Sequence, residues 1–199
     1  MYENLERIEW TNCWREDSQG KERVLLIGDS ITNGYKSLVH KKLDGKLCVS
    51  AIMTSKSLAN PHLLEEIELL ARQEDYAYKI IHFNSGLHSG GQSQEEYGEN
   101  LEKAILWLQK TFPNAVITLA NSTPTTVRDN PNEFIEGSVQ KYNAEVARLG
   151  EKYGLAVDDL YSVVYGKPEV RVPDGYHYAP AGYDLLSTKV TEFLLANLS

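Results

Sequence analysis

The feature that most constrains this chain is its alternation of short apolar runs with longer stretches of helical periodicity. Five runs are rich in β-forming residues: 23–28, 47–53, 78–84, 115–120 and 155–157. Runs that are apolar on both faces are typical of parallel strands with helices on each side of the sheet. The alternation therefore predicts an α/β fold, a three-layer α/β/α sandwich around a five-stranded parallel sheet.

The intervening segments carry apolar residues at helical spacing. They predict a helix that begins at Pro61, helices over residues 101–112 and 139–149, and a last helix over about residues 179–195. No repeat, low-complexity tract or linker interrupts this pattern. With 199 residues, the chain is near the length at which one hydrophobic core is filled, so we expect a single domain over residues 1–199.

Charge and hydropathy limit the classes of partner. The formal net charge of −8 repels a phosphate backbone, so we expect no nucleic-acid partner. No run approaches the ~20 apolar residues of a membrane span, and residues 1–7 lack the features of a secretory signal, so we expect a cytoplasmic protein without a membrane partner. Neither Cys13 nor Cys48 lies near a histidine at a metal-binding spacing, so no metal site is predicted. The sequence does not indicate the oligomeric state.

The first candidate for chemistry is Ser30, which follows the first predicted strand. In a parallel α/β sheet, ligands bind at the carboxyl ends of the strands. Gly28 permits a sharp exit from the strand, and Ser30 then falls at the start of a helix, where its unpaired N–H can hold a developing negative charge. The alternative is that Ser30 serves only as a helix N-cap, which is a common use of serine.

The second candidate is an Asp-x-x-His motif just before the last predicted helix. Asp174 precedes His177 by three residues, so within one turn its carboxylate can accept a hydrogen bond from the imidazole and fix its tautomer. The other ring nitrogen can then take a proton from a serine. The alternative is a loop aspartate beside a surface histidine.

Together, the Gly-Asp-Ser-Ile motif at residues 28–31 and the block at residues 174–183 resemble the GDSL, or SGNH, family of esterases and lipases. The resemblance spans Val24 to about Leu195 and implies the flavodoxin-like, SGNH-hydrolase type of sandwich. It implies three catalytic residues: the nucleophile Ser30, the general base His177 and its orienting partner Asp174. A G-x-S-x-G elbow is absent, so the α/β-hydrolase fold is not the right comparison.

The family also has oxyanion donors besides the N–H of the nucleophile, and here the sequence departs from the family pattern. Ser55 stands where the family has a glycine N–H after the second strand. Where the family has an asparagine in a Gly-x-Asn-Asp block, alignment on Gly86 places His88, whereas alignment on the end of the strand brings Asn84 close. Either side chain can donate a hydrogen bond. We favour Asn84 as the donor, with His88 lining the pocket.

The remaining candidates concern the substrate. Asp29, Gly86, Thr123 and Arg128 are expected to border the site, and the hydroxyls and Arg128 of the loop after the fourth strand suit a polar acyl or sugar ester. An ordinary surface loop is the alternative for this segment. The resemblance implies a serine esterase for short-chain acyl esters that needs no cofactor, and O-acetyl groups on carbohydrate are the preferred class because no long apolar lid is visible. A catalytically inactive binding module and a receiver-like signalling domain are the rival hypotheses.

Overall fold

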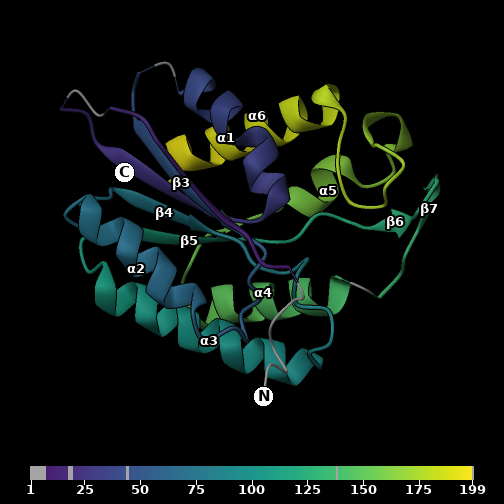
Figure 1. Ribbon diagram of the computed structural model, residues 1–199, viewed down its shortest axis with the longest axis horizontal. Helices are drawn as coiled ribbons and strands as arrows, with labels where there is room; N and C mark the ends of the chain where they lie inside the picture. The colour runs from purple at the N-terminus through teal and green to yellow at the C-terminus, as the bar shows by residue number, and fades with distance from the viewer. Residues whose placement is uncertain (1–7, 18–19, 44, 138, 199) are drawn as a thin grey trace.

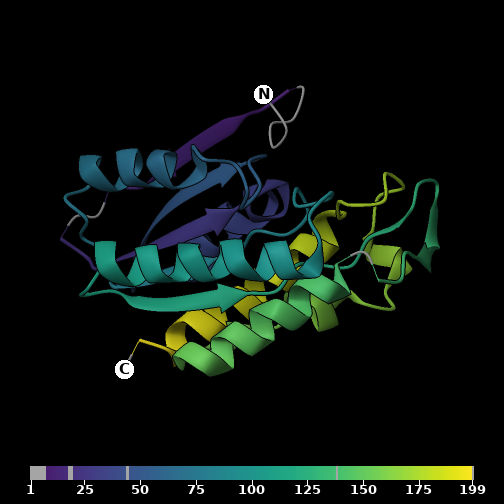
Figure 2. The same cartoon turned by 90° about the horizontal axis from the view of Figure 1, so that it is seen from below.

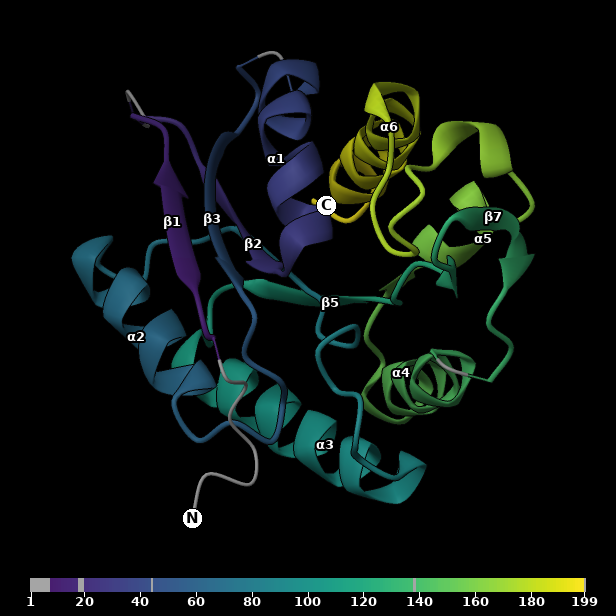
Figure 3. The ribbon, with the colours of Figure 1, turned by 45° about the vertical axis from the view of Figure 1, so that its right-hand side comes forward.

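The computed structural model describes residues 8–17, 20–43, 45–137 and 139–198. Its main sheet has six strands in the order β1-β3-β2-β4-β5-β8. The bounds of these strands are β1 Thr11–Arg15, β2 Arg23–Gly28, β3 Cys48–Thr54, β4 Ile80–Phe83, β5 Val116–Ala120 and β8 Val157–Asp158. All neighbours pair in parallel except β1, which runs antiparallel to β3 at the edge of the sheet (Figure 3).

Two layers of helices cover the sheet, as predicted. The helices α1 Ser30–Lys42, α5 Leu160–Val164 and α6 Pro180–Ala196 lie on one face, and α2 Leu63–Gln73, α3 Gln94–Thr111 and α4 Gln140–Tyr153 lie on the other (Figure 1). Figure 2 shows the second set across the near face of the sheet. Within the ranges described, no helix is both long and apolar enough to cross a membrane. The structure therefore confirms the three-layer sandwich.

The two faces of the sheet follow from the alternation of side chains along each strand. In β2, Val24 and Leu26 pack with the helices α1 and α6, whereas Leu25 and Ile27 pack with α2, α3 and α4. Because successive side chains point to opposite faces, a central strand that is covered on both faces must be apolar at every position. This requirement explains why β2 reads as one continuous apolar run.

The prediction of five strands is corrected to six by the edge strand β1. Its sequence, Thr-Asn-Cys-Trp-Arg, is polar and its side chains are exposed or half-buried. An edge strand has a neighbour on one side only and needs no continuous apolar run, so periodicity gives little sign of it. The strand is nevertheless paired with β3 over all five of its residues.

A small hairpin extends from the main sheet after β5. It consists of β6 Thr126–Val127 and β7 Asn130–Phe134, and it lies at the right of Figure 1. The N–H of Thr126 donates to the Gly175 carbonyl at 2.9 Å, and the N–H of Asp129 donates to the Pro173 carbonyl at 2.8 Å. The hairpin therefore supports the loop that leads into α6. This loop follows the 3₁₀ turn η1 Pro168–Val170.

Candidate active site

Ser30 is the first residue of α1, directly beyond the carboxyl end of β2. Asp29, not Ser30, caps this helix, because its Oδ1 accepts a hydrogen bond from the N–H of Ile31 at 2.8 Å. The turn requires Gly28, since a Cβ at that position would lie 2.0 Å from Thr32 Oγ1. The N–H of Ser30 lies in the first helical turn, which has no intrahelical acceptor, so it can bind a negative charge. The hydroxyl of Ser30 therefore takes no part in capping the helix.

His177 lies in the loop of residues 171–179, here called the His177 loop, which leads into α6. Its Nε2 lies 2.8 Å from Ser30 Oγ, although 147 residues separate the two along the chain. Its Nδ1 lies 2.7 Å from Asp174 Oδ2. The structure therefore brings together the three side chains that the two sequence motifs supplied.

The environment of Asp174 favours the ionised carboxylate. Partial burial opposes ionisation, but the N–H groups of Tyr176 and His177, each 2.8 Å from Asp174 Oδ1, and the imidazole of His177 outweigh it and lower the pKa of Asp174. A carboxylate at this position accepts a hydrogen bond from Nδ1–H of His177. The Nε2 atom is then the acceptor for the hydroxyl of Ser30, which is the arrangement that lets a serine lose its proton.

Arg171 is a residue of this region that the sequence analysis missed. Its buried guanidinium donates hydrogen bonds to the Pro124 carbonyl at 2.8 Å, the Gly175 carbonyl at 3.2 Å and the Tyr178 hydroxyl at 2.7 Å. The Tyr178 ring lies 4.7 Å from the guanidinium carbon, within the range of a cation–π contact. These contacts fix the His177 loop to the segment after β5. The only sequence signal was a charged residue between two valines.

The geometry does not favour Ser55 as an oxyanion donor. The N–H of Ser55 donates to the Trp10 carbonyl at 3.0 Å, and its Oγ accepts from the N–H of Trp10 at 3.0 Å. The cause is the strand β1, whose ladder with β3 continues by one residue through Ser55. A backbone N–H that already donates within a buried ladder cannot also bind the substrate without losing that bond.

The preference for Asn84 over His88 is not supported either. The Nδ2 group of Asn84 donates to the Ala120 carbonyl at 2.9 Å and lies 3.5 Å from Ser122 Oγ. The Asn84 side chain is buried and joins the ends of β4 and β5. His88 is half-buried and lines the same small cavity as Asn84, beside Asp29, the residue before Ser30. Because the Asn84 amide is directed to the Ala120 carbonyl, the geometry favours His88 over Asn84 as the candidate donor.

Two buried tyrosines bind the backbone of the segment that carries His88. The Tyr97 hydroxyl donates to the Ser85 carbonyl at 2.5 Å, and the Tyr142 hydroxyl donates to the Ser89 carbonyl at 2.7 Å. Gly86 lies between these points, and a Cβ there would lie 2.0 Å from a serine Oγ of the next loop. Gly86 therefore permits a close approach of two loops at the edge of the cavity.

The remaining predicted binding residues occupy different positions. Thr123 is buried and lines a second small cavity with Asp29 and Asn84. Arg128 is exposed on the hairpin, at the turn between β6 and β7. The N–H of Thr126 binds the His177 loop, so the Arg128 side chain extends from a hairpin that borders the site. Thr123 thus lines the interior, whereas Arg128 lies on the exposed turn of the hairpin.

The buried carboxyl of Asp29 leads to a prediction of how the stability of the protein depends on pH. Burial raises the pKa of its carboxyl, against the opposing effects of the Ile31 N–H and of positive charge on His88 and His177. Above the ordinary pKa of aspartate, the unfolded chain has lost this proton, so folding must either rebind the proton or bury the charge. The destabilising contribution of Asp29 therefore grows as pH rises from the ordinary pKa through the raised one.

We expect Asp29→Asn to keep the helix cap and remove this contribution, since asparagine and aspartate cap about equally well. The free energy of unfolding of the variant, measured by urea denaturation, should gain on that of the wild type as the pH rises above about 4, the ordinary pKa of aspartate. The control Asp29→Ala should lose about 1 kcal/mol with the cap. A difference between the Asp29→Asn variant and the wild type that stays constant across this pH range would contradict the prediction.

The chain matches a known protein family in sequence and several solved structures in fold. The model of the GDSL-like lipase/acylhydrolase family matches residues 26–185. A solved member of the lipolytic protein G-D-S-L family from Veillonella parvula aligns with a TM-score of 0.68 at 17% identity, covering 87% of this chain and 98% of that one. Among curated proteins, none matches the chain in sequence.

Two further solved structures share the fold. The acetyl xylan esterase AlAXEase aligns with a TM-score of 0.66 at 18% identity, covering 86% of this chain and 99% of that one. A carbohydrate acetylesterase family member from Sinorhizobium meliloti aligns with a TM-score of 0.70 at 16% identity, covering 89% and 99%. The matched family segment includes Ser30 and the turn from Asp174 to His177, and it covers most of the chain. The protein therefore belongs to the GDSL-like lipase/acylhydrolase family.

Proposed function

We propose that this protein is a serine esterase that hydrolyses short-chain acyl esters, with O-acetyl groups on carbohydrate as preferred substrates. The single observation that carries the proposal is the pair of hydrogen-bonding distances that join Ser30 to His177 and His177 to Asp174, at 2.8 and 2.7 Å. A serine, a histidine and a carboxylate in this order form the arrangement that activates a hydroxyl for attack on a carbonyl carbon.

In the proposed reaction, Ser30 Oγ attacks the ester carbonyl while His177 Nε2 takes its proton. The Asp174 carboxylate stabilises the imidazolium that forms. The N–H of Ser30 and the side chain of His88 bind the negative oxygen of the tetrahedral intermediate. His177 then gives the proton to the leaving alcohol, and a water molecule hydrolyses the acyl-enzyme by the same route.

The enclosed space beside Asp29, the neighbour of the proposed nucleophile, is small. The cavity lined by Asp29, Gly86 and His88 has a volume of about 10 Å³, which is room for about one water molecule. A long acyl chain would have to lie outside it. Acetyl xylan esterase and carbohydrate acetylesterase, the names of two structural neighbours, support carbohydrate as the alcohol.

A specific observation also keeps an inactive binding module as the second candidate. The Ser55 N–H is engaged by Trp10, and a histidine stands where the family has an asparagine, so both additional oxyanion donors are altered. A fluorophosphonate probe distinguishes the two candidates, because it reacts with an activated serine but not with an ordinary one. Labelling of Ser30, located by peptide mass spectrometry, supports the esterase; a folded protein without label supports the binding module.

A panel of p-nitrophenyl esters tests the acyl specificity. We expect kcat/KM to be highest for acetate and to fall by more than about tenfold for octanoate, because each methylene that finds no pocket loses binding energy in the transition state. Acetylated xylose and acetylated xylan, assayed by acetate release, test the alcohol. A preference for octanoate would contradict the assignment of a short acyl group.

A further inference from the structure

The strand β1 reaches the proposed site although it precedes the segment that matches the family, residues 26–185. Trp10, the residue before the strand begins, exchanges two hydrogen bonds with Ser55. Its ring lies edge-on to the imidazole of His88, with ring centroids 6.3 Å apart and an angle of 81° between the planes. This is a favourable arrangement for an aromatic pair. Trp10 therefore contacts the side chain proposed as an oxyanion donor.

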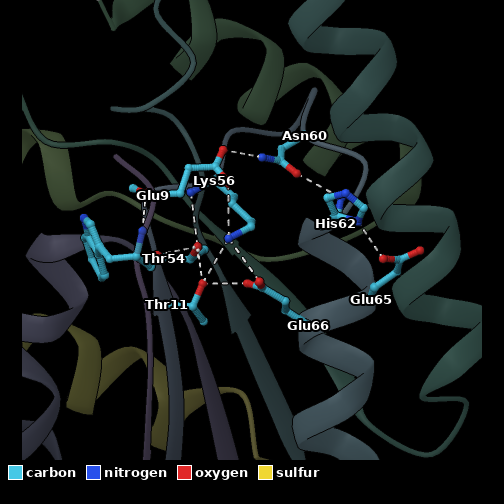
Figure 4. Close-up of polar contacts among 10 residues, drawn as sticks. Glu9, Thr11, Thr54, Lys56, Asn60, His62, Glu65 and Glu66 are labelled. Atoms are coloured by element: carbon cyan, nitrogen blue, oxygen red, sulfur yellow. Dashed lines mark hydrogen bonds and ion pairs between the residues drawn. The ribbon is translucent and has the colours of Figure 1, made fainter. Parts of the chain in front are cut away.

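Lys56 binds the side chains of both neighbours of Trp10 (Figure 4). The Lys56 Nζ atom lies 3.5 Å from Glu9 Oε2, 3.0 Å from Glu66 Oε1 and 3.3 Å from Thr11 Oγ1. Only 9% of the Lys56 side chain is exposed, so these partners are what makes its buried charge tolerable. The segment that carries Trp10 is thereby tied to the loop after β3 and to α2.

A second link strengthens the same connection. The Asn60 Nδ2 group donates to Glu9 Oε1 at 2.7 Å, and the Thr11 hydroxyl donates to Glu66 Oε2 at 2.6 Å (Figure 4). The residues before and after Trp10 therefore each have side-chain partners in the adjoining loop or helix. A ring on a backbone held at both ends, with only two side-chain torsions of its own, is a rigid support for a neighbouring ring.

We propose that Trp10 is a positioning residue, whose ring holds the imidazole of His88 at the orientation in which it donates to the oxyanion. The proposal rests on the proposed esterase function and on His88 as the donor. Trp10 itself touches no reacting atom. The effect is expected to be large enough to measure, because an oxyanion donor stabilises the transition state only when it is aimed at the position where charge develops, and a small misplacement is costly.

The test is a double-mutant cycle with p-nitrophenyl acetate as substrate. Trp10→Ala should lower kcat about tenfold and change KM by less than about twofold, and Trp10→Phe, which keeps an aromatic edge, should recover most of the loss. In a His88→Ala background, Trp10→Ala should cause no further loss, because the group that Trp10 positions is already gone. A merely structural role would lower kcat by the same factor in both backgrounds.

The matched control is Trp14→Ala. Trp14 lies on β1, four residues after Trp10. It makes the same kind of edge-on contact with a histidine, at 5.5 Å and 76°, but this histidine, His40, lies on α1 rather than at the site. This variant should leave kcat unchanged. If Trp10→Ala does not fold, Trp10→Leu, which keeps apolar bulk without the ring, takes its place in the cycle.

Three outcomes decide the matter. A kcat of the Trp10 variant equal to that of the wild type, or an equal loss in both backgrounds, overturns the positioning role and leaves the esterase intact. A wild-type protein that neither turns over the ester nor reacts with the fluorophosphonate overturns the proposed function, and the role of Trp10 with it. A loss confined to the background that retains His88 supports the proposal.

Discussion

Replacing Ser30 with alanine is expected to lower kcat for p-nitrophenyl acetate by roughly 10⁴–10⁶-fold, the range seen when a serine nucleophile is removed. The reason is that the hydroxyl, 2.8 Å from the His177 Nε2 atom that takes its proton, is the group that forms the acyl-enzyme. The free energy of unfolding should change by less than about 1 kcal/mol, because Asp29 rather than Ser30 caps α1.

The control for this experiment is Ser37→Ala. Ser37 is an exposed serine two turns further along α1, so the same change is made on the same helix away from the site. It should leave turnover and stability unchanged. His177→Ala should resemble Ser30→Ala in its loss of kcat, since the two groups act as a unit. Turnover by the Ser30 variant within about tenfold of the wild type would show that another nucleophile is at work.

The sheet could be predicted because its buried strands carry a strong local signal. The strands β2, β3, β4 and β5 are covered on both faces or nearly so, and the resulting apolar runs are visible without any knowledge of their neighbours. The strand β1 and the hairpin of β6 and β7 gave no such signal, because polar or exposed residues make up most of their length. Their existence depends on pairing with distant segments rather than on their own composition.

The same distinction applies to the site. Ser30, Asp174 and His177 could be found because each lies in a short motif whose local geometry is sufficient: a turn after a strand, and a carboxylate three residues before an imidazole. The use of Ser55 and Asn84 could not be found in this way, since it depends on partners far along the chain. Trp10 lies 45 residues from Ser55, and Ala120 lies 36 residues from Asn84.

Whether Asn84 or His88 matches the family's asparagine was left open by the sequence for a chemical reason. An amide and an imidazole can both donate, so residue type does not distinguish Asn84 from His88. What distinguishes them is where each side chain is used. Both side chains line the same small cavity, but the buried Asn84 amide is directed to a carbonyl at the end of β5, whereas the half-buried His88 imidazole lies edge-on to Trp10. The two side chains should therefore differ in what their removal affects.

His88→Ala is expected to lower kcat by roughly 10²–10³-fold, which corresponds to about 2.7–4 kcal/mol of transition-state stabilisation from one oxyanion donor. KM should change little, because the interaction strengthens only when the carbonyl oxygen becomes negative. His88→Asn, which restores the family's amide at this place, should retain more of the activity than alanine does. The measurement is a steady-state comparison on p-nitrophenyl acetate with each variant's fold verified by urea denaturation.

Asn84→Ala supplies the opposite expectation. Its loss leaves the buried Ala120 carbonyl without the donor it has at 2.9 Å, so the free energy of unfolding should fall by about 1–3 kcal/mol. The kcat of the folded variant should fall less than that of His88→Ala, because the Asn84 amide is directed to the Ala120 carbonyl and joins two strand ends. A larger loss of kcat in Asn84→Ala, with both variants folded, would return the donor role to Asn84. It would also remove the reason for Trp10 to hold the imidazole in place.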